Sequence, residues 1–435
     1  MGETIEKNLV SNSRSLPNIP VTDNVRPLSA NEIVREEARC KSNPLGISWY
    51  LFIPLLAMTC MLLMPYGRAL FVDAGFRWAY VLLLAFGISF SMNPVFSKIS
   101  FKLNILDCPD RRKLHREATP VLGGAAVFSG FLAALLINGI FTLELGAILV
   151  SSMILFIVGV MDDCKEMAAG VKLLAQVISG TLVIICGIVL RVLPLDMGLF
   201  AHTGNVLLTL IWIVGITNAM NFFDGMDGLA AGLGVLISFF LGVVAFQTAQ
   251  PFIGWIAVAM MGSCLGFLPY NFKIKGHASI FLGDAGSTVI GFILASLAVY
   301  GDWAEGNPIV ALISPILIFW ILIFDMVHIT FDRILTGRVM NFRQWIEYVG
   351  NDHLHHRLAN ILGGNKKSVL FIYLLSVSLG LSSVALRNAR VVDAVLLILQ
   401  ATIFVILITF LERRGRLQKS SLGSKIDSGV AEVIR

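Results

Sequence analysis

Twelve long apolar segments run through the chain and constrain its fold more than any other feature. A bilayer core needs roughly 20 consecutive apolar residues in a helix, and each segment is close to that length, with 146–161 the shortest. The segments lie at about 47–66, 78–99, 121–141, 146–161, 171–193, 204–220, 229–248, 252–270, 279–300, 307–331, 368–386 and 393–411. Of the 435 residues, 56% are hydrophobic and only 14% are charged, whereas soluble domains average about 25% charged residues. The sequence therefore predicts an all-α, polytopic integral membrane protein with about 11–12 transmembrane helices.

The two ends of the chain differ from this apolar body. Residues 1–45 are polar, mixed in charge and contain four prolines, so they are too polar for a signal peptide and read as a disordered cytoplasmic tail. We expect a transmembrane domain over 46–412 and a second cytoplasmic tail over 413–435.

Lysine and arginine gather in alternate loops and predict the orientation of the chain. The segments 98–119 and 332–367 and the C-terminal tail are rich in both residues, and the loops between them are poorer. Because positively charged loops stay in the cytoplasm, both termini and these segments are expected there. Arg387 and Arg390, in a turn assigned to the outer side, are the weak point of this topology.

Five aspartates lie at or near the cytoplasmic ends of these apolar segments, where an isolated carboxylate is unfavourable. They are Asp162, Asp163, Asp224, Asp227 and Asp284. Ionisable side chains at membrane depth line wet cavities, bind cations or form pairs, and they mark functional sites by default. Their convergence on one face predicts a single site open to cytoplasmic solutes and to the inner leaflet.

The spacing of these acids suggests metal and phosphate chemistry. Asp224 and Asp227 are three residues apart and would share a face of a helical turn, while Gly225 and Gly228 permit a local break. Such oxygen ligands suit Mg²⁺, which is usually held by one or two carboxylates together with substrate phosphates. Asp162 and Asp163 repel one another and so need a cation or a raised pKa, although a solvated helix cap would explain them equally well.

Basic and histidine-rich segments accompany the acids. Lys113, His115 and Arg116 would capture an anionic headgroup, or they could merely satisfy the positive-inside rule. The second cluster consists of His353, His355, His356 and Arg357. It suits a phosphate or sugar diphosphate better than zinc, because it lacks a second ligand cluster and a nearby cysteine. Asp325 and His328 share a helical face, either as a buried structural pair or as part of the chemistry.

Several function classes find no support in the sequence. There is no P-loop, no Gly-x-Gly-x-x-Gly unit, no H-E-x-x-H and no G-x-S-x-G motif, which argues against ATP hydrolysis and serine or zinc protease chemistry. The six cysteines are scattered and form no C-x-x-C pair, so neither a disulfide framework nor a zinc site is expected. A secondary transporter or lipid carrier is the main alternative, because intramembrane carboxylates also serve ion coupling.

The ordered motifs resemble the polyprenyl-phosphate N-acetylhexosamine-1-phosphate transferase family, of the glycosyltransferase 4 type. The resemblance covers about 93–364 and consists of His-Arg-x-x-x-Pro-x-x-Gly-Gly at 115–124, Asp-Asp at 162–163, Asn-x-x-Asp-Gly-x-Asp-Gly at 221–228, Gly-Asp-x-Gly-Ser at 283–287 and His-Leu-His-His-Arg-Leu at 353–358. The last block is similar to the branch that uses GlcNAc-1-phosphate and undecaprenyl phosphate. One departure is Glu166, which stands where that branch often has aspartate.

The resemblance implies the reaction and the partners. A UDP-sugar and undecaprenyl phosphate would give undecaprenyl-diphosphate-sugar and UMP, the first lipid-linked step of a cell-envelope polysaccharide. The enzyme would lie in the bacterial cytoplasmic (inner) membrane, need Mg²⁺ (or Mn²⁺) and use no nucleic acid. The sequence leaves the sugar, the polymer and the oligomeric state open, a homodimer included.

The resemblance also implies roles for individual residues. Asp227 and Asp284 would hold the metal, with Asp224 and Asn221 close by. Asp162 or Asp163 would bind or deprotonate the lipid phosphate. The diphosphate or sugar would be held by His353, His355, His356 and Arg357, and anions would be steered by Lys113, His115, Arg116 and Lys172.

Overall fold

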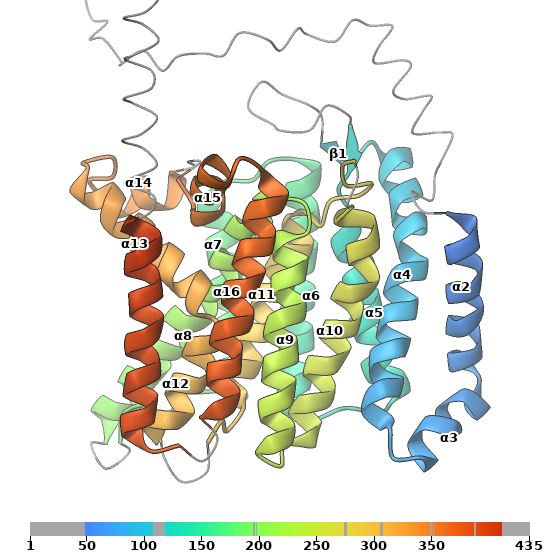
Figure 1. The fold of residues 1–435 in the computed structure, drawn as a ribbon, viewed down its shortest axis with the longest axis horizontal. Helices are drawn as coiled ribbons and strands as arrows, with labels where there is room; N and C mark the ends of the chain where they lie inside the picture. Colours follow the sequence, from blue (N-terminus) through green and yellow to red (C-terminus); the bar gives the residue numbers. More distant parts are fainter. Residues whose placement is uncertain are drawn as a thin grey trace, which may run out of the picture.

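A computed structural model gives the fold for residues 48–410, except 108–117, 195, 197, 274–275, 305–307, 349, 351 and 387–388. The described chain is almost entirely helical, as the sequence predicts (Figure 1). Its helices in chain order are α2 (Trp49–Leu63), α3 (Pro65–Asp73), α4 (Arg77–Leu103), α5 (Gly123–Ile137), α6 (Leu143–Cys164), α7 (Ala169–Ile185), α8 (Leu199–Phe222), η3 (Phe223–Gly225), α9 (Leu229–Gln247), α10 (Pro251–Asn271), α11 (Gly283–Tyr300), α12 (Pro308–Ile318), α13 (Trp320–Leu335), α14 (Phe342–Glu347), α15 (Leu354–Leu362), α16 (Asn365–Ala385) and a last helix, Val391–Phe410. Two short strands, β1 (Leu106–Asp107) and β2 (Thr119–Pro120), pair antiparallel.

The multi-span prediction is confirmed, but the twelve expected spans are not all single long helices. Among the described residues, eight helices are long and apolar enough to cross a membrane, or up to ten if each bent pair counts as one span. The apolar helices α5 and α7, at 15 and 17 residues, fall short of the expected length. The segment 146–161 was expected to be the shortest span, but the helix that contains it, α6, is longer and has 22 residues.

Two expected spans are broken helices. The α2–α3 pair and the α12–α13 pair are each bent by 79°. At the first break, Met64 is extended with φ −73° and ψ 144°, and Pro65 begins α3. A residue before proline is disfavoured in the helical region, so Pro65 ends α2 and redirects the chain. The sequence is predominantly apolar throughout 47–66 and 307–331, so hydropathy alone could not reveal either bend.

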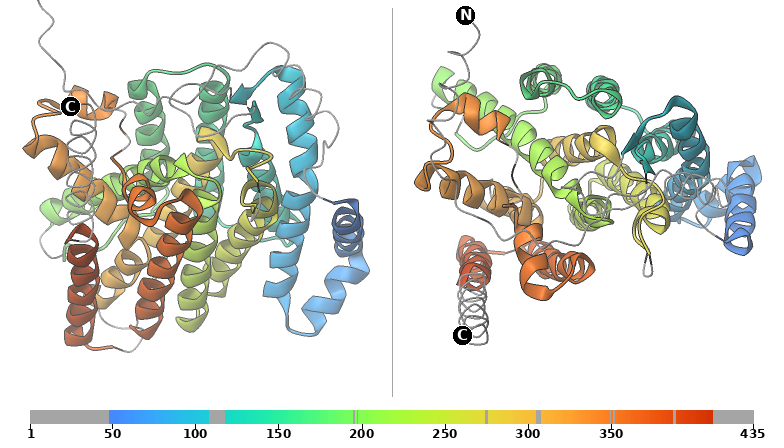
Figure 2. Two further views of the ribbon diagram at one scale, coloured as in Figure 1. Left: turned by 45° about the horizontal axis from the view of Figure 1, so that its top comes forward. Right: turned by 90° about the horizontal axis from the view of Figure 1, so that it is seen from above.

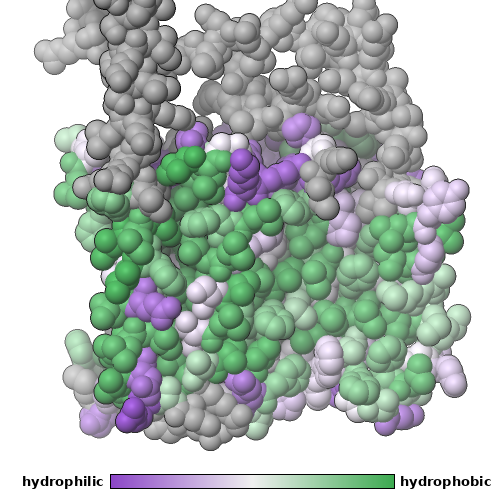
Figure 3. Space-filling view, viewed as in Figure 1, coloured by the Kyte–Doolittle hydropathy of each residue, from purple (hydrophilic) through white to green (hydrophobic). Residues whose placement is uncertain are grey.

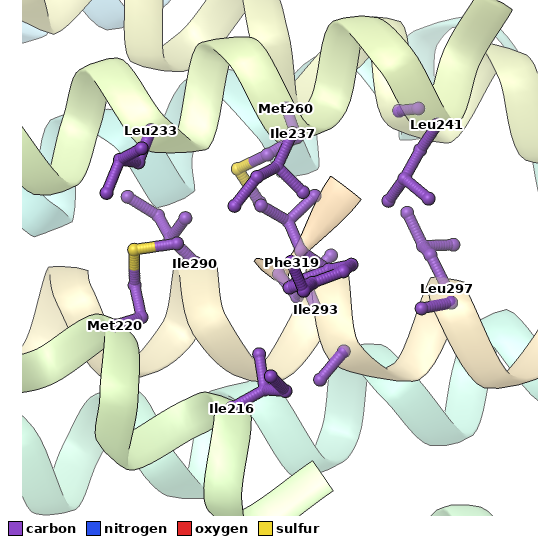
Figure 4. Packing of buried hydrophobic residues seen from close by; sticks show 14 of the residues in the cluster. Ile216, Met220, Leu233, Ile237, Leu241, Met260, Ile290, Ile293, Leu297 and Phe319 are labelled. Carbon is purple, nitrogen blue, oxygen red and sulfur yellow. The ribbon is translucent and has the colours of Figure 1, made fainter. Parts of the chain in front are cut away.

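Helices α8 to α11 enclose the core near the site. Figure 4 shows Ile216 and Met220 of α8, Leu233 and Ile237 of α9 and Ile290 of α11 pointing toward one another, and all five are at most 4% exposed. By contrast, the last helix exposes half of its apolar side chains. Apolar side chains cover most of the visible flank of the molecule, and hydrophilic ones gather at its upper and lower edges (Figure 3).

Small residues allow α5, α6 and α11 to converge at that upper edge. A Cβ added to Gly124 would lie 2.3 Å from the Cα of Gly286, and one added to Gly159 would lie 2.4 Å from the Cα of Ala285. Both neighbours are backbone atoms, so larger side chains would push the helices apart. Close approach through small residues is typical of membrane helices. It places the C-terminal end of α6 beside the start of α11, at the end of the bundle where α15 and β1 also lie (Figures 1 and 2).

Candidate active site

A lysine joins two of the five aspartates. Lys172 Nζ of α7 lies 2.9 Å from Asp162 Oδ2 of α6 and 3.0 Å from Asp284 Oδ2 of α11. Asp162 also accepts a hydrogen bond from the Met167 amide at 2.7 Å, which fixes the turn between α6 and α7. Three helices therefore contribute to one charged cluster, which we call the acidic half of the site: Asp162, Asp163, Lys172 and Asp284.

Asp163 has a different place from its neighbour. Its Oδ1 accepts from the amide of Asp284 at 2.9 Å, and its Oδ2 accepts from the amide of Ala285 at 3.3 Å. The first amides of a helix lack acceptors within the helix. For α11 the acceptor is the Asp163 carboxylate, which comes from α6. Gly283 begins that helix with φ +75°, and a Cβ there would meet Asp163 Oδ2 at 2.6 Å. The glycine of the Gly-Asp-x-Gly-Ser motif therefore allows this contact.

The segment 221–228 contains a break between α8, which ends at Phe222, and α9, which begins at Leu229. Asp224 has non-helical angles, with φ −78° and ψ 20°, and Met226 is extended. The expectation that Asp224 and Asp227 share a helical face was wrong, while the expectation of a break at the glycines was right. Gly228 has φ +83° and donates its amide to Asn271 Oδ1 at 2.6 Å.

This break points its polar groups at the acidic half. Asp224 lies close enough to interact electrostatically with Asp163, Asp227 and Asp284. Asn221 Nδ2 donates to Ser287 Oγ at 2.9 Å and its side chain also bonds Asp284. Asp227 Oδ2 accepts from the Ala278 amide at 3.0 Å. All five predicted aspartates thus belong to one neighbourhood.

The basic loop that carries Lys113, His115 and Arg116 lies outside the described residues. Its flanks are described, however. The β1–β2 pair brings 106–107 and 119–120 together. The exit from β2 is bonded to the start of α11, because the Phe281 amide donates to the Pro120 carbonyl at 2.8 Å and the Gly124 amide to the Leu282 carbonyl at 2.8 Å. Both ends of the loop are therefore anchored beside the acidic half.

The histidine block lies on the other side of the 221–228 break. We call Asp325, His353, His355, His356 and Arg357 the histidine half of the site. A Cβ on Gly225 would lie 2.8 Å from His355 Nε2 and 3.5 Å from His356 Nε2. The rings of Phe222 and His353 lie 5.0 Å apart, and those of Phe223 and His355 lie 5.3 Å apart. Residues about 130 positions apart in the chain thus form one site.

His355 is held in an environment that disfavours its charged form. It is fully buried, and neither ring nitrogen has a hydrogen-bond partner among the described residues. Burial, followed by the nearby His356, His353 and Arg357, lowers the pKa of His355 well below its ordinary value. Burial also lowers the pKa of His356, with a further contribution from His353. Both rings are therefore neutral near pH 7.

An arginine–carboxylate pair closes this half of the site. Arg333 donates from Nε and Nη2 to the two oxygens of Asp352 at 2.9 and 2.7 Å, and its guanidinium lies 4.4 Å from the centre of the Tyr348 ring. Burial opposes the charge on Asp352, but the bonds from Arg333 outweigh it and hold the pKa of that carboxyl below its ordinary range. The pair fixes the chain just before His353.

Comparisons with known proteins decide the family. Residues 145–302 match the family model described as glycosyl transferase family 4, a range that holds all five aspartates and Lys172. The chain is 32% identical to a protein of Bacillus subtilis (strain 168) named "Probable undecaprenyl-phosphate N-acetylglucosaminyl 1-phosphate transferase", over 72% of this chain and 86% of that one. The chain belongs to glycosyl transferase family 4.

Further relatives of this family 4 transferase have similar names. A decaprenyl-phosphate N-acetylglucosaminephosphotransferase of Mycobacterium leprae (strain TN) is 31% identical, over 68% of this chain and 81% of the relative. An undecaprenyl-phosphate alpha-N-acetylglucosaminyl 1-phosphate transferase of Yersinia pestis is 28% identical, over 55% and 67%. The protein is a multi-span membrane phosphotransferase. The comparisons give no support to the transporter or lipid carrier alternative.

The transferase has donors that fit a hard cation, although the described side chains form no closed cage. No group of three or more histidines, cysteines or acids within the described residues is arranged to hold a metal. Lys172 lies between Asp162 and Asp284. The nearby donors are carboxylate and amide oxygens, which suit Mg²⁺, an ion that commonly takes only one or two protein carboxylates.

Several residues that shape the site were missed from the sequence. Asn271 bonds the Gly228 amide and, through Nδ2, the Ile280 carbonyl at 3.0 Å. Tyr373 of α16 donates its hydroxyl to the Gly228 carbonyl. Each is a polar side chain at the edge of, or inside, an apolar segment. That position was the one feature of the sequence that could have marked these residues as part of the site. Ser287 lay within a recognised motif but had no assigned partner.

Proposed function

We propose that this transferase moves N-acetylglucosamine 1-phosphate from its UDP-linked donor to undecaprenyl phosphate and releases UMP. The observation that carries the proposal is the meeting of two unlike clusters at the 221–228 break, at one end of an apolar bundle. Names of relatives that act on polyprenyl phosphates and N-acetylglucosamine 1-phosphate support it. The product would be the first lipid-linked intermediate of a cell-envelope polysaccharide.

The acidic half suits the reacting phosphates. A phosphate monoester has a second pKa near 6, so the lipid phosphate is largely deprotonated at pH 7 and needs orientation more than a strong base. Both oxygens of Asp163 accept hydrogen bonds from α11 amides. This also favours a role in positioning the lipid phosphate over a role as a catalytic base. Lys172, between Asp162 and Asp284, supplies a positive charge to attract the incoming anion. Asp227 and Asp284 would hold Mg²⁺, which when bound neutralises the diphosphate and the departing UMP.

The histidine half suits the donor. Arg357 is a cation with several donor groups, and guanidinium groups bind phosphate through paired hydrogen bonds. The imidazoles of His353, His355 and His356 can donate or accept according to tautomer. A buried ring with unpaired nitrogens is unfavourable, so the two nitrogens of His355 favour a polar partner. With the cationic segments placed by the positive-inside rule, the site would face the cytoplasm of a bacterial inner membrane, where soluble UDP-sugars are found.

The test uses the purified full chain with undecaprenyl phosphate and a panel of UDP-sugars, in Mg²⁺, Mn²⁺ or EDTA. We expect UMP only when lipid, donor and divalent ion are all present, and most UMP with UDP-N-acetylglucosamine. Reactions that lack lipid control for hydrolysis of the donor. UMP from no donor would contradict the transferase function, undiminished UMP in EDTA would contradict the metal, and preference for another sugar would correct the substrate.

A further inference from the structure

Asp325 of α13 is a buried acid whose two oxygens both serve one neighbouring segment. The residue is 0% exposed and lies in an apolar helix among Ile321, Leu322 and Ile329. Its Oδ2 lies 2.8 Å from His353 Nδ1, and its Oδ1 accepts from the Leu354 amide at 2.7 Å. Burying a carboxylate is unfavourable unless it is paired or hydrogen-bonded. Both hydrogen-bonding partners come from the beginning of α15, and Arg357 Nη2 of the same helix lies 3.9 Å from Oδ1.

The beginning of α15 depends on this contact. His353 is the residue before the helix, and its side chain makes no capping bond to the helix amides. An unpartnered amide in the first turn needs an acceptor, which Asp325 provides from a different helix. Since α15 has only nine residues, its orientation depends on such tertiary contacts more than on its own hydrogen bonds.

A second contact repeats the arrangement one turn further along. Arg357 Nη1 lies 3.0 Å from His328 Nδ1. His328 is three residues after Asp325 on α13, and Arg357 is four residues after His353 on α15. Residues at these spacings lie on one helical face. Two levels of polar contact thus join the same faces of α13 and α15.

We propose that Asp325 is a positioning residue that keeps a proton on His353 Nδ1 and sets the start of α15. A carboxylate accepts only, so its bond to the ring is donated by Nδ1, and the bond made by one ring nitrogen determines the role of the other. His353 Nε2 is then the nitrogen offered to a substrate. The assignment of the substrate to this half of the site rests on the proposed function, whereas the tautomer does not.

Histidine ¹⁵N NMR tests the tautomer without any assay of activity. The chain has seven histidines, so full-length protein labelled at histidine gives a small set of signals, and His353→Gln identifies the one of interest. At pH 8 we expect wild-type His353 to carry a proton on Nδ1. In Asp325→Asn the amide oxygen must serve the Leu354 amide, which leaves the NH₂ group facing the ring and moves the proton to Nε2. A wild-type proton on Nε2 alone, or an unchanged signal in a folded Asp325→Asn protein, would overturn the proposal.

Kinetics test whether Asp325 acts through His353. We expect Asp325→Asn to lower kcat/KM for the UDP-sugar by about 10–100-fold, by analogy with the loss seen when the outer partner of a metal-ligating histidine is removed. Asp332→Asn is the matched control, because that residue lies on the same helix with a side chain 48% exposed, and it should keep wild-type activity. In the His353→Gln background, adding Asp325→Asn should lower kcat/KM for the UDP-sugar little further.

The kinetic outcomes separate the two proposals. Multiplicative losses in the double variant would overturn the role of Asp325 as a positioning residue, as would full activity of Asp325→Asn. An absence of UMP in the wild type would overturn the transferase proposal and leave the NMR result to decide the place of Asp325.

Discussion

The two halves of the site solve the problem of polar groups at membrane depth in different ways. In the acidic half, like charges gather around one cation, with Asp162 and Asp284 sharing Lys172. In the histidine half, a buried acid holds His353, and burial lowers the pKa of His355 and His356 so that both rings are neutral. One half therefore pairs its acids with a lysine, whereas the other keeps two of its imidazoles neutral.

This difference matches the tasks proposed for each half. A cluster with excess negative charge favours the binding of cations. Its Lys172 can also exchange a carboxylate partner for an incoming phosphate. Neutral rings without excess charge can contact a diphosphate or sugar without binding it as tightly as a cation cluster would. Charges arranged before the substrate arrives need little reorganisation during the reaction. The comparison predicts that substitutions in the acidic half affect catalysis most and that acid pH affects the histidine half most.

Asp284→Asn should have the largest effect. The change removes a charge that Lys172 contacts and one of the two carboxylates assigned to the metal. We expect UMP release to fall by about 100–1000-fold, as when one electrostatic group is removed from an active site, with normal expression. The measurement is UMP formation across a range of Mg²⁺ concentrations. Asp302→Asn, an exposed acid beyond the other end of α11, is the control, and full activity of Asp284→Asn would refute the metal assignment.

Asp163→Ala should act mainly on stability. It removes the acceptor for the first amides of α11, and loss of a helix N-cap typically costs about 0.5–2 kcal/mol. Denaturant unfolding in detergent measures the change. Asp162→Ala, which leaves both α11 amides paired, is the comparison. If Asp163→Ala unfolds like the wild type and yet loses activity, its carboxylate acts in chemistry rather than as a cap.

Acid pH should destabilise the histidine half. The pKa of His355 is lowered in the folded protein, so below about 6.5 the unfolded chain takes up its proton first. The contribution of His355 to the free energy of unfolding should therefore fall as pH drops below that value, by at most about 1.4 kcal/mol per pH unit. The pKa of Asp352 is also lowered, but the stability it contributes is present above its ordinary pKa of about 3.9 and is lost only at lower pH.

Unfolding between pH 8 and 5 checks this expectation. His355→Phe keeps a ring against Phe223 and removes the titrating group, so its stability should depend less on pH than that of the wild type. The dependence that persists would come from the other titrating groups, among them His356. An identical pH dependence in the two proteins would show that the pKa of His355 is the same in the folded and unfolded states and would contradict the prediction.

The sequence predicted the fold class and most of the site because these follow from composition and local pattern. Long apolar runs can fold in a membrane only as helices here, and aspartates at their ends are rare enough to stand out. The motif residues Asp162, Asp224 and Asp284 were found in this way, and His353 by the clustering of histidines around it. The bend between α12 and α13 was not, because the apolar run continues through it, and the roles of Asn271 and Tyr373 were not, because each depends on a partner far away in the chain.

What the sequence by itself determined is the inventory of the site: which acids, histidines and cations it contains, and that they lie near one end of a membrane bundle. Only the tertiary structure decided their division of labour. Asp162 and Asp163 are adjacent and chemically identical, yet one pairs with Lys172 and the other caps α11. That choice follows from the close approach of α5, α6 and α11 at Gly124, Gly159 and Gly286, because a carboxylate's role is set by the donors that packing brings within its reach.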